Sequence, residues 1–203
     1  MEREQTIRPQ KDCIPHKATW VKDAAAAFHP ERNALQTTTG ELLYNYLVVC
    51  PGIRLRFDLI KGLQESVGKN GVSSNYSYDS VQSTRDFMEA TTTGHHVFTA
   101  PKCTVKCGGG PLKAAFLVDD FNRLRGTRDQ QSYAFYTGLQ ACFGVPYYRT
   151  HLQELLQSRG IEEKIDHNLV EALAVAVLPV LPMPLVLPVL LVLLVPLACQ
   201  QEL

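Results

Sequence analysis

The sequence predicts an α/β fold in which a βαβαβ unit with a parallel sheet accompanies a small antiparallel β segment. Two observations lead to this prediction. Residues 95–170 alternate between short apolar runs and longer amphipathic stretches, as in doubly wound sheets. Residues 18–50 contain extended runs on both sides of the hairpin-type turn Thr39-Gly40. The 203 residues suffice for one ordinary domain or for two partial ones.

Extended segments dominate the first quarter of the chain. We expect strands over residues 19–27 and 34–38. Residues 42–50 are apolar and partly β-branched, and Pro51-Gly52 ends this run sharply. A continuous apolar run of this kind predicts a strand that is buried on both faces. Residues 54–75 contain three glycines and are expected to be loop-like.

Strands and helices alternate in the second part of the chain. Apolar residues at helical spacing predict one helix that precedes the alternation, over residues 79–91, with Ser77 as its N-cap. In the first helix of the alternating unit, Leu124 is expected on the buried face together with Ala115 and Val118. The predicted order is strand 95–99, helix 112–124, strand 131–136, helix 147–159 and strand 161–170.

The composition disfavours two classes of function. Twenty basic residues balance twenty acidic ones, and no basic stripe is interleaved with aromatic residues, so a nucleic-acid partner is not expected. The six cysteines include no pair with the CxxC spacing of a metal site. His95 and His96 are adjacent on a predicted strand and point to opposite faces, so they cannot share one ion. We therefore predict no metal site.

The two ends of the chain differ in character. Residues 1–11 are polar and of mixed charge, unlike a secretory signal or a transit peptide. Residues 172–199 contain no charged residue and five prolines, each of which costs roughly 3 kcal/mol inside a helix. Two interpretations of this stretch stay open: a membrane anchor, or low-complexity sequence from a mis-predicted reading frame that replaces a native C-terminal half.

The sharpest local motif is a cysteine followed by three glycines, Cys107-Gly108-Gly109-Gly110, between a predicted strand and a predicted helix. The start of a helix carries partial positive charge, which favours a thiolate over a thiol. Lys106 and Lys113 are expected to add to this effect. A reactive thiol is one interpretation. The alternative is that Cys107 is a small packed residue and that the glycines only form a turn.

Several short elements together resemble sulfide:quinone oxidoreductase of the mitochondrial and related bacterial type. The order and spacing fit across about residues 14–171. The matching elements are Tyr46-Leu47-Val48-Val49-Cys50-Pro51-Gly52-Ile53, Ile60-Lys61-Gly62-Leu63, Ser74-Asn75-Tyr76-Ser77, Val105-Lys106-Cys107-Gly108-Gly109-Gly110-Pro111-Leu112-Lys113, Phe143-Gly144-Val145-Pro146 and His167-Asn168-Leu169-Val170.

The resemblance implies a partial FAD/NAD(P)-binding flavoprotein with two dinucleotide domains. It implies sulfide oxidation in which Cys107 is the first redox cysteine, carries a persulfide, and passes electrons through FAD to quinone. A small thiol or sulfite would accept the sulfur. The full-length enzyme would lie on a membrane surface, either the mitochondrial inner membrane or a bacterial plasma membrane. The alternative is a related flavoprotein without the cysteine, such as an NADH dehydrogenase-like protein. The presence of Cys107 favours sulfide:quinone oxidoreductase over this alternative.

The resemblance also implies cofactor contacts and boundaries. Ala25 would contact the adenine end of FAD, Pro51 and Gly52 would pass the flavin, and Lys113 would stabilise anionic sulfur or reduced flavin. Cys50 stands where the family usually has alanine and is not expected to be redox-active. The implied segments are an N-terminal extension (1–17), a partial FAD-binding domain (18–76), a second dinucleotide-type domain (77–171) and a low-complexity tail (172–203).

Several parts of the family pattern are missing from the sequence. It has neither the GxGxxG fingerprint for the FAD pyrophosphate nor the second redox cysteine, and the C-terminal flavin motif and amphipathic helices are also missing. We therefore expect that this chain alone does not hold FAD tightly and does not turn over. A catalytically inactive fragment with a hydrophobic tail remains an alternative reading.

Overall fold

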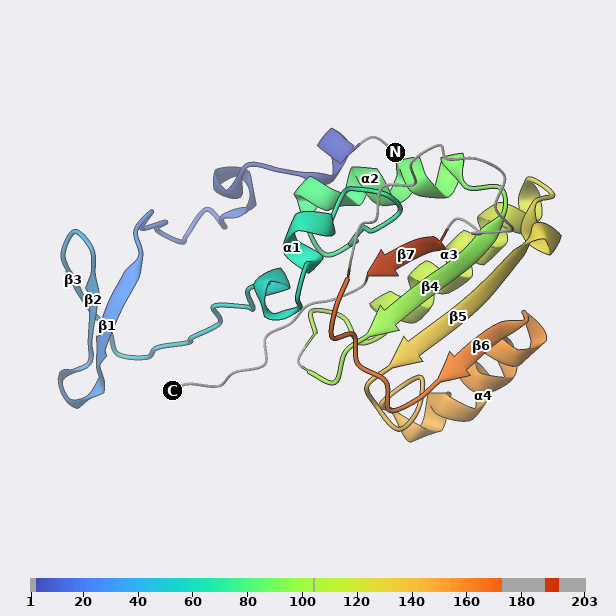
Figure 1. The fold of residues 1–203 in the computed structure, drawn as a ribbon. Helices are drawn as coiled ribbons and strands as arrows, with labels where there is room; N and C mark the ends of the chain where they lie inside the picture. The colour runs from blue at the N-terminus through green and yellow to red at the C-terminus, as the bar shows by residue number, and fades with distance from the viewer. Residues whose placement is uncertain (1–2, 104, 173–188, 194–203) are drawn as a thin grey trace. The chain divides into compact units, whose positions relative to one another are not determined.

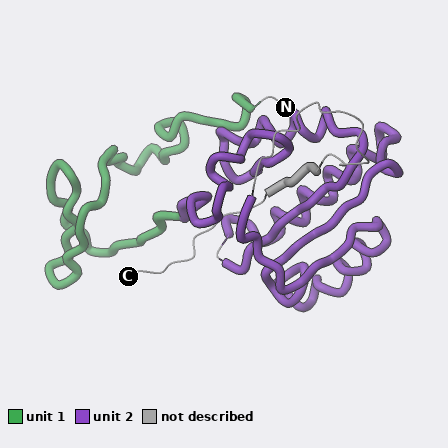
Figure 2. The backbone as a smooth tube through the Cα atoms, viewed as in Figure 1, with its two compact units in different colours: residues 1–52 green, residues 53–203 purple. Residues whose placement is uncertain are grey.

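The computed structural model describes residues 3–103, 105–172 and 189–193, the last of these by backbone alone. The chain forms two compact units, Met1–Gly52 and Ile53–Leu203 (Figure 2). We describe each unit by itself. The four segments expected from the family resemblance remain a prediction.

The first unit contains the small antiparallel sheet that the sequence predicts. Its strands pair in the order β1-β2-β3, and the turn at Thr39-Gly40 joins β2 to β3. The carboxylate of Asp23 accepts hydrogen bonds from the backbone N–H groups of Ala24 (2.8 Å) and Thr39 (3.0 Å), which ties the chain before β1 to this turn. The elements are η1 (Arg3–Thr6), η2 (Gln10–Cys13), β1 (Ala25–His29), η3 (Pro30–Arg32), β2 (Ala34–Thr37) and β3 (Glu41–Leu43).

Two strand predictions in this unit are wrong in extent. The first strand begins at Ala25 and not at residue 19, because Asp23 and Ala24 take part in the turn contacts. The apolar run over residues 42–50 does not form a doubly buried strand. The third strand ends at Leu43, and the side chain of Tyr46 is 93% exposed. A strand buried on both faces needs a layer of structure over each face of its sheet, and all three residues of β3 are exposed.

The second unit contains a four-stranded parallel sheet with the strand order β6-β5-β4-β7 (Figure 1). The predicted βαβαβ order is confirmed, since α3 connects β4 to β5 and α4 connects β5 to β6. The elements are η4 (Phe57–Leu59), α1 (Leu63–Ser66), α2 (Tyr78–Ala90), β4 (Gly94–Ala100), α3 (Gly110–Leu124), η5 (Arg128–Gln130), β5 (Gln131–Thr137), α4 (Pro146–Ser158), β6 (Ile161–Lys164) and β7 (Val189–Leu193). The tail prediction otherwise lies outside the described residues.

Three details of the second unit differ from the prediction. Residues 54–75, expected to be a loop, contain the short helices η4 and α1. The last strand ends at Lys164 and not at residue 170, because Asp166 adopts a left-handed conformation with φ of 56°, which interrupts an extended chain. The side chain of Leu124 is 89% exposed. It lies about 200° around the helix from Asn122, which is buried.

The main core of the second unit lies between the sheet and its helices. Phe98 of β4 and Phe135 of β5 are fully buried, and Ala115 of α3 and Leu156 of α4 pack against them. Ser77 caps α2 as predicted, because its hydroxyl accepts a hydrogen bond from the backbone N–H of Asp79 (3.2 Å). Burial of these apolar side chains is the main force that holds the helices on the sheet.

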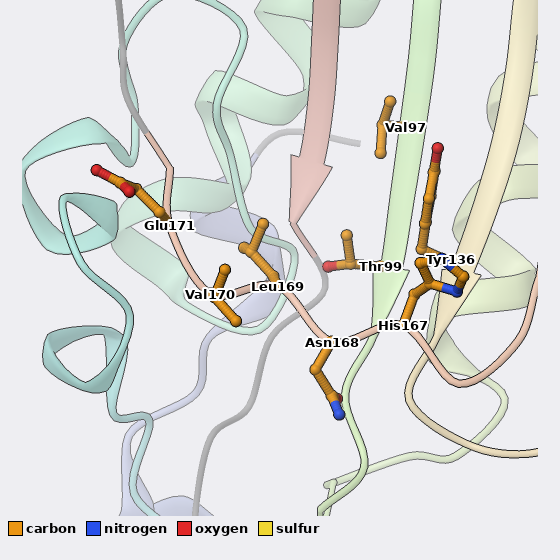
Figure 3. A pocket seen from close by; sticks show the side chains of 8 residues that line it. All are labelled: Val97, Thr99, Tyr136, His167, Asn168, Leu169, Val170 and Glu171. Carbon is orange, nitrogen blue, oxygen red and sulfur yellow. The ribbon is translucent and has the colours of Figure 1, made fainter.

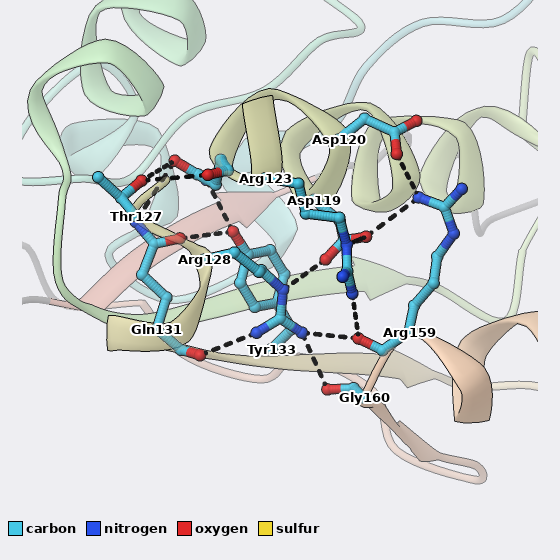
Figure 4. A network of polar contacts seen from close by, with 10 residues as sticks. Asp119, Asp120, Arg123, Thr127, Arg128, Gln131, Tyr133, Arg159 and Gly160 are labelled. Carbon is cyan, nitrogen blue, oxygen red and sulfur yellow. Dashed lines mark hydrogen bonds and ion pairs between the residues drawn. The ribbon is translucent and has the colours of Figure 1, made fainter. Parts of the chain in front are cut away.

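A buried carboxylate joins the helices to the strands at one end of the sheet (Figure 4). Asp119 of α3 is fully buried and contacts Arg123 (2.8 Å), Arg159 (3.0 Å) and Arg128. The guanidinium of Arg128 also donates to the carbonyl oxygens of Gln131 (3.0 Å) and Arg159 (2.7 Å). Burial alone would raise the pKa of Asp119, but the arginine hydrogen bonds outweigh it and hold this pKa below its usual value.

Replacing Asp119 with asparagine is expected to lower the free energy of unfolding by about 3 kcal/mol, because it leaves arginine charges without their buried partner. Urea unfolding measures the loss. The matched control is Asp120→Asn, one residue along the same helix. Asp120 is half-exposed and contacts Arg159 at 2.6 Å, so this change should cost less than about 1 kcal/mol. Equal losses in the two variants would contradict the assigned role of Asp119.

His96 gives the second unit a pH-dependent stability. Its side chain is fully buried on β4 and stacks on the ring of Tyr133, with 4.6 Å between centroids. Neither ring nitrogen meets the geometry of a hydrogen bond with a described residue, and an interaction with Gln131 offsets only part of the effect of burial on the pKa of His96. Burial, with help from His95 and two nearby arginines, lowers the pKa of His96 from its ordinary value of 6.5 to about 4. The folded chain therefore holds this imidazole neutral where the unfolded chain protonates it.

The free energy of unfolding should fall as the pH drops from about 6.5 to 4, by up to roughly 3 kcal/mol, because only the unfolded state takes up this proton. Urea titrations at stepped pH measure the slope. His96→Phe should flatten it. His95→Gln should retain most of it, because burial and not His95 is the main cause of the lowered pKa, and the His95 ring is itself partly exposed, with the Ser132 hydroxyl at 2.7 Å. An unchanged slope in His96→Phe would exclude His96 as the cause.

Candidate active site

The cysteine-glycine turn lies between the end of β4 at Ala100 and the start of α3 at Gly110. In parallel sheets, this carboxyl edge of the strands is where ligand sites form. Cys107 is exposed there as a free thiol, so the alternative that it is a packed small residue is wrong. A Cβ atom on Gly108 or Gly109 would lie 3.9 Å from the Phe143 ring, which places this ring beside the turn.

The turn is held by hydrogen bonds to one carbonyl group. The carbonyl oxygen of Cys107 accepts from the backbone N–H of Gly110 (2.9 Å) and from the hydroxyl of Tyr76 (3.0 Å). A Cβ atom on Gly110 would lie 2.7 Å from the Tyr76 hydroxyl oxygen, closer than such atoms approach. Only glycine at position 110 permits this approach without a shift of Tyr76.

The surroundings of Cys107 favour its thiolate form. Hydrogen bonding from the backbone of Gly109 is the main cause that lowers the pKa of the Cys107 thiol, and Lys113 and the backbone of Gly110 lower it further. Slight burial opposes them. Lys106, expected from the sequence to contribute, is not among the causes. Backbone N–H groups at the start of a helix stabilise the negative charge of a thiolate.

The structure brings together two of the five site residues predicted from the sequence. These two are Cys107 and Lys113, which lies one helical turn into α3 and is close enough to lower the pKa of the Cys107 thiol. The other three, Ala25, Pro51 and Gly52, belong to the first unit.

The FAD contacts expected of these three residues remain a prediction. Ala25 pairs with Thr37 in the β1–β2 ladder and is exposed. Pro51 and Gly52 are exposed, and a Cβ atom on Gly52 would meet nothing within 4 Å. All three residues are exposed in the first unit, and we derive no step through this cofactor.

Sequence reasoning missed the roles of Tyr76 and Phe143. Both residues stand in elements that carry the family resemblance, but nothing in the spacing indicates that they contact a turn around residue 108. The only signal available was the glycine run itself, since three successive glycines indicate close approach by other groups.

A small cavity lies at the carboxyl end of β4 and β5 (Figure 3). Its volume is about 280 Å³, and its wall is mostly apolar. The Thr99 hydroxyl is buried without a hydrogen-bond partner among the described residues. The Asn168 side chain accepts from the backbone N–H of Lys102 at 3.0 Å and so links the segment after β6 to the end of β4. The lining residues are Val97, Thr99, Tyr136, His167, Asn168, Leu169, Val170 and Glu171.

The described part of the chain offers neither a cluster of metal ligands nor a membrane-spanning helix. Residues 3–103, 105–172 and 189–193 contain no cluster of three or more His, Cys, Asp or Glu side chains that could hold a metal ion. Within the same ranges, no helix has both the length and the apolar character to span a membrane.

Comparison with known proteins identifies relatives by sequence. No protein-family model matches the chain. The mitochondrial sulfide:quinone oxidoreductase of Dictyostelium discoideum is 43% identical over 171 residues, which are 83% of this chain and 38% of that protein. The enzyme of the same name from Mus musculus is 34% identical over 167 residues, 82% of this chain and 37% of that protein. The chain thus spans less than two fifths of the length of these relatives.

Solved structures agree on the fold. A chain of the Tetrahymena thermophila mitochondrial ATP synthase matches with a TM-score of 0.63 and 17% identity, over 85% of this chain and 45% of that one. The sulfide:quinone oxidoreductase of Aquifex aeolicus matches with a TM-score of 0.57 and 20% identity, over 72% of this chain and 34% of that one. The predicted fold class, an α/β fold with a parallel βαβαβ unit and a small antiparallel β segment, is confirmed. By sequence and by fold, the chain belongs to the sulfide:quinone oxidoreductase family, as a partial-length member.

Proposed function

We propose that this chain is the part of a sulfide:quinone oxidoreductase that carries the first redox cysteine, Cys107. One observation carries the proposal: an exposed thiol lies at a glycine turn before a helix, and its pKa is lowered there. The complete flavoprotein would oxidise sulfide and pass two electrons through FAD to quinone. Relatives named mitochondrial support a mitochondrial location, and we place the complete enzyme on the inner membrane.

The sulfur step that Cys107 supports is transfer from a persulfide. A small thiolate or sulfite attacks the outer sulfur of the Cys107 persulfide, and the bond between the two sulfur atoms breaks. The outer sulfur leaves with the acceptor, and Cys107 keeps the electron pair as a thiolate. No external oxidant or reductant is needed for this step. A thiol with a lowered pKa is a better leaving group, because its thiolate is stabilised.

Lys113 and the backbone of the turn have complementary roles in this chemistry. The turn N–H groups and the Lys113 ammonium favour negative charge on the sulfur, before attack and after departure. The exposure of Cys107 leaves room for a small acceptor. A dehydrogenase-like flavoprotein would have no need of a cysteine at this turn, so Cys107 favours the sulfide enzyme over that alternative.

Labelling with iodoacetamide tests whether Cys107 is the reactive thiol. Mass mapping at neutral pH should find Cys107 alkylated faster than Cys13, which is also an exposed free thiol. Lys113→Gln should slow the labelling of Cys107 several-fold, because it removes a nearby positive charge. Lys106→Gln, the matched control, should change it little. If Cys13 reacts as fast as Cys107 in the unmodified chain, the proposal fails.

The flavin content of the purified chain can also be tested. The purified 203-residue chain should show no stoichiometric flavin absorbance in the visible region, because the sequence lacks the GxGxxG fingerprint that binds the FAD pyrophosphate. Spectra before and after incubation with excess FAD and desalting measure this. A yellow protein with one flavin per chain would refute it.

A further inference from the structure

We infer that Tyr76 is a positioning residue for Cys107, whose hydroxyl holds the glycine turn in the conformation that directs backbone N–H groups toward the sulfur. The inference rests on the proposed function in one respect, that Cys107 is the reactive thiol. It adds a residue from a different element, since Tyr76 precedes α2 and Cys107 precedes α3.

Two hydrogen bonds converge on the carbonyl oxygen of Cys107. The Tyr76 hydroxyl donates to the Cys107 carbonyl oxygen at 3.0 Å, and the Gly110 N–H donates to the same oxygen at 2.9 Å. One donor lies within the turn and the other comes from 31 residues away. The two lone pairs of this carbonyl are therefore used, and its direction is set from two sides.

The orientation of the Cys107 carbonyl also determines the position of the backbone that follows it. The Cys107 carbonyl and the Gly108 N–H belong to one planar peptide unit, so fixing the carbonyl also fixes where the following backbone begins. The backbone of Gly109 and Gly110 then lies where it stabilises the thiolate. Successive glycines have little conformational preference of their own. A bond from outside the turn is what selects one conformation.

Tyr76 is itself held in place by packing and by hydrogen bonds. Its ring packs against the main core of the second unit, next to the residues that α3 buries. Its backbone N–H donates to the Ser74 hydroxyl at 3.3 Å, and the Ser80 hydroxyl donates to the Ser74 carbonyl at 2.7 Å. The hydroxyl of Tyr76 is thus presented by a packed ring on an anchored backbone, which is what positioning requires.

The hydroxyl also remains a donor while the thiol ionises. Burial, followed by the nearby Cys107 and Cys103, raises the pKa of Tyr76 above its ordinary value of 10.0. Tyr76 therefore keeps its proton through the pH range in which Cys107 loses one.

The test is the pH profile of Cys107 alkylation by iodoacetamide in Tyr76→Phe, which keeps the ring and removes the donor. We expect the profile to move to higher pH and the rate at neutral pH to fall about threefold to tenfold. Tyr147→Phe is the control, because this tyrosine is 78% exposed on α4 and its loss should leave the profile unchanged. Cys13 in each chain reports any general change in reactivity.

A second variant makes the test independent of Tyr76→Phe. Gly110→Ala places a methyl group against the Tyr76 hydroxyl, 2.7 Å from its oxygen, and should shift the Cys107 profile by a similar amount. Added to Tyr76→Phe, the same substitution should shift it little further, because the bond is already lost. Additive shifts would contradict the inference.

The outcomes separate the inference from the proposed function. If Cys107 reacts faster than Cys13 but Tyr76→Phe leaves its profile unchanged, Tyr76 has no positioning role and the proposed function stands. If Cys107 of the unmodified chain reacts no faster than Cys13, the proposed function fails and the inference falls with it.

Discussion

The parallel pairing of β4 with β5 is the constraint on which the site depends. Parallel neighbours need a crossover connection, and here the crossover is the loop after β4 followed by α3. This connection brings a strand end and a helix start together at the carboxyl edge of the sheet, with Cys107 between them. The core around Phe98 and Phe135 holds the strands, and the Asp119 network secures the opposite end of α3.

The chemistry of the thiol follows from backbone geometry more than from neighbouring charges. The main stabilisation of the Cys107 thiolate comes from the N–H of Gly109, and Lys113 contributes after it. Backbone groups have this influence only when the turn has one conformation, and glycines do not enforce one. The contact from Tyr76 relates the Ser74–Ser77 element to the cysteine turn in physical terms. Two of the motifs behind the family resemblance are therefore parts of one structure.

The sequence predicted what depends on local pattern. Apolar periodicity predicted the βαβαβ unit. The cysteine followed by three glycines predicted a turn between a strand and a helix, with Cys107 in it. The run over residues 42–50 was mispredicted, because apolar composition alone does not supply the layers that would cover both faces of a strand, and β3 and Tyr46 are exposed. The role of Tyr76 could not be predicted, because a bond from a side chain to a backbone carbonyl 31 residues away leaves no periodic pattern. The left-handed Asp166, which ends the β6 region early, was equally invisible.

The most direct test of the account is to measure where the chain accepts sulfane sulfur. The unmodified protein is incubated with inorganic polysulfide, and its thiols and persulfides are trapped by alkylation. The mass of each cysteine-containing peptide is then measured by mass spectrometry. The account predicts that the gain of one sulfur atom appears first and mainly on Cys107. Equal sulfur gain on Cys107 and on the exposed Cys13 would contradict the claim that the glycine turn makes this thiol a sulfur carrier.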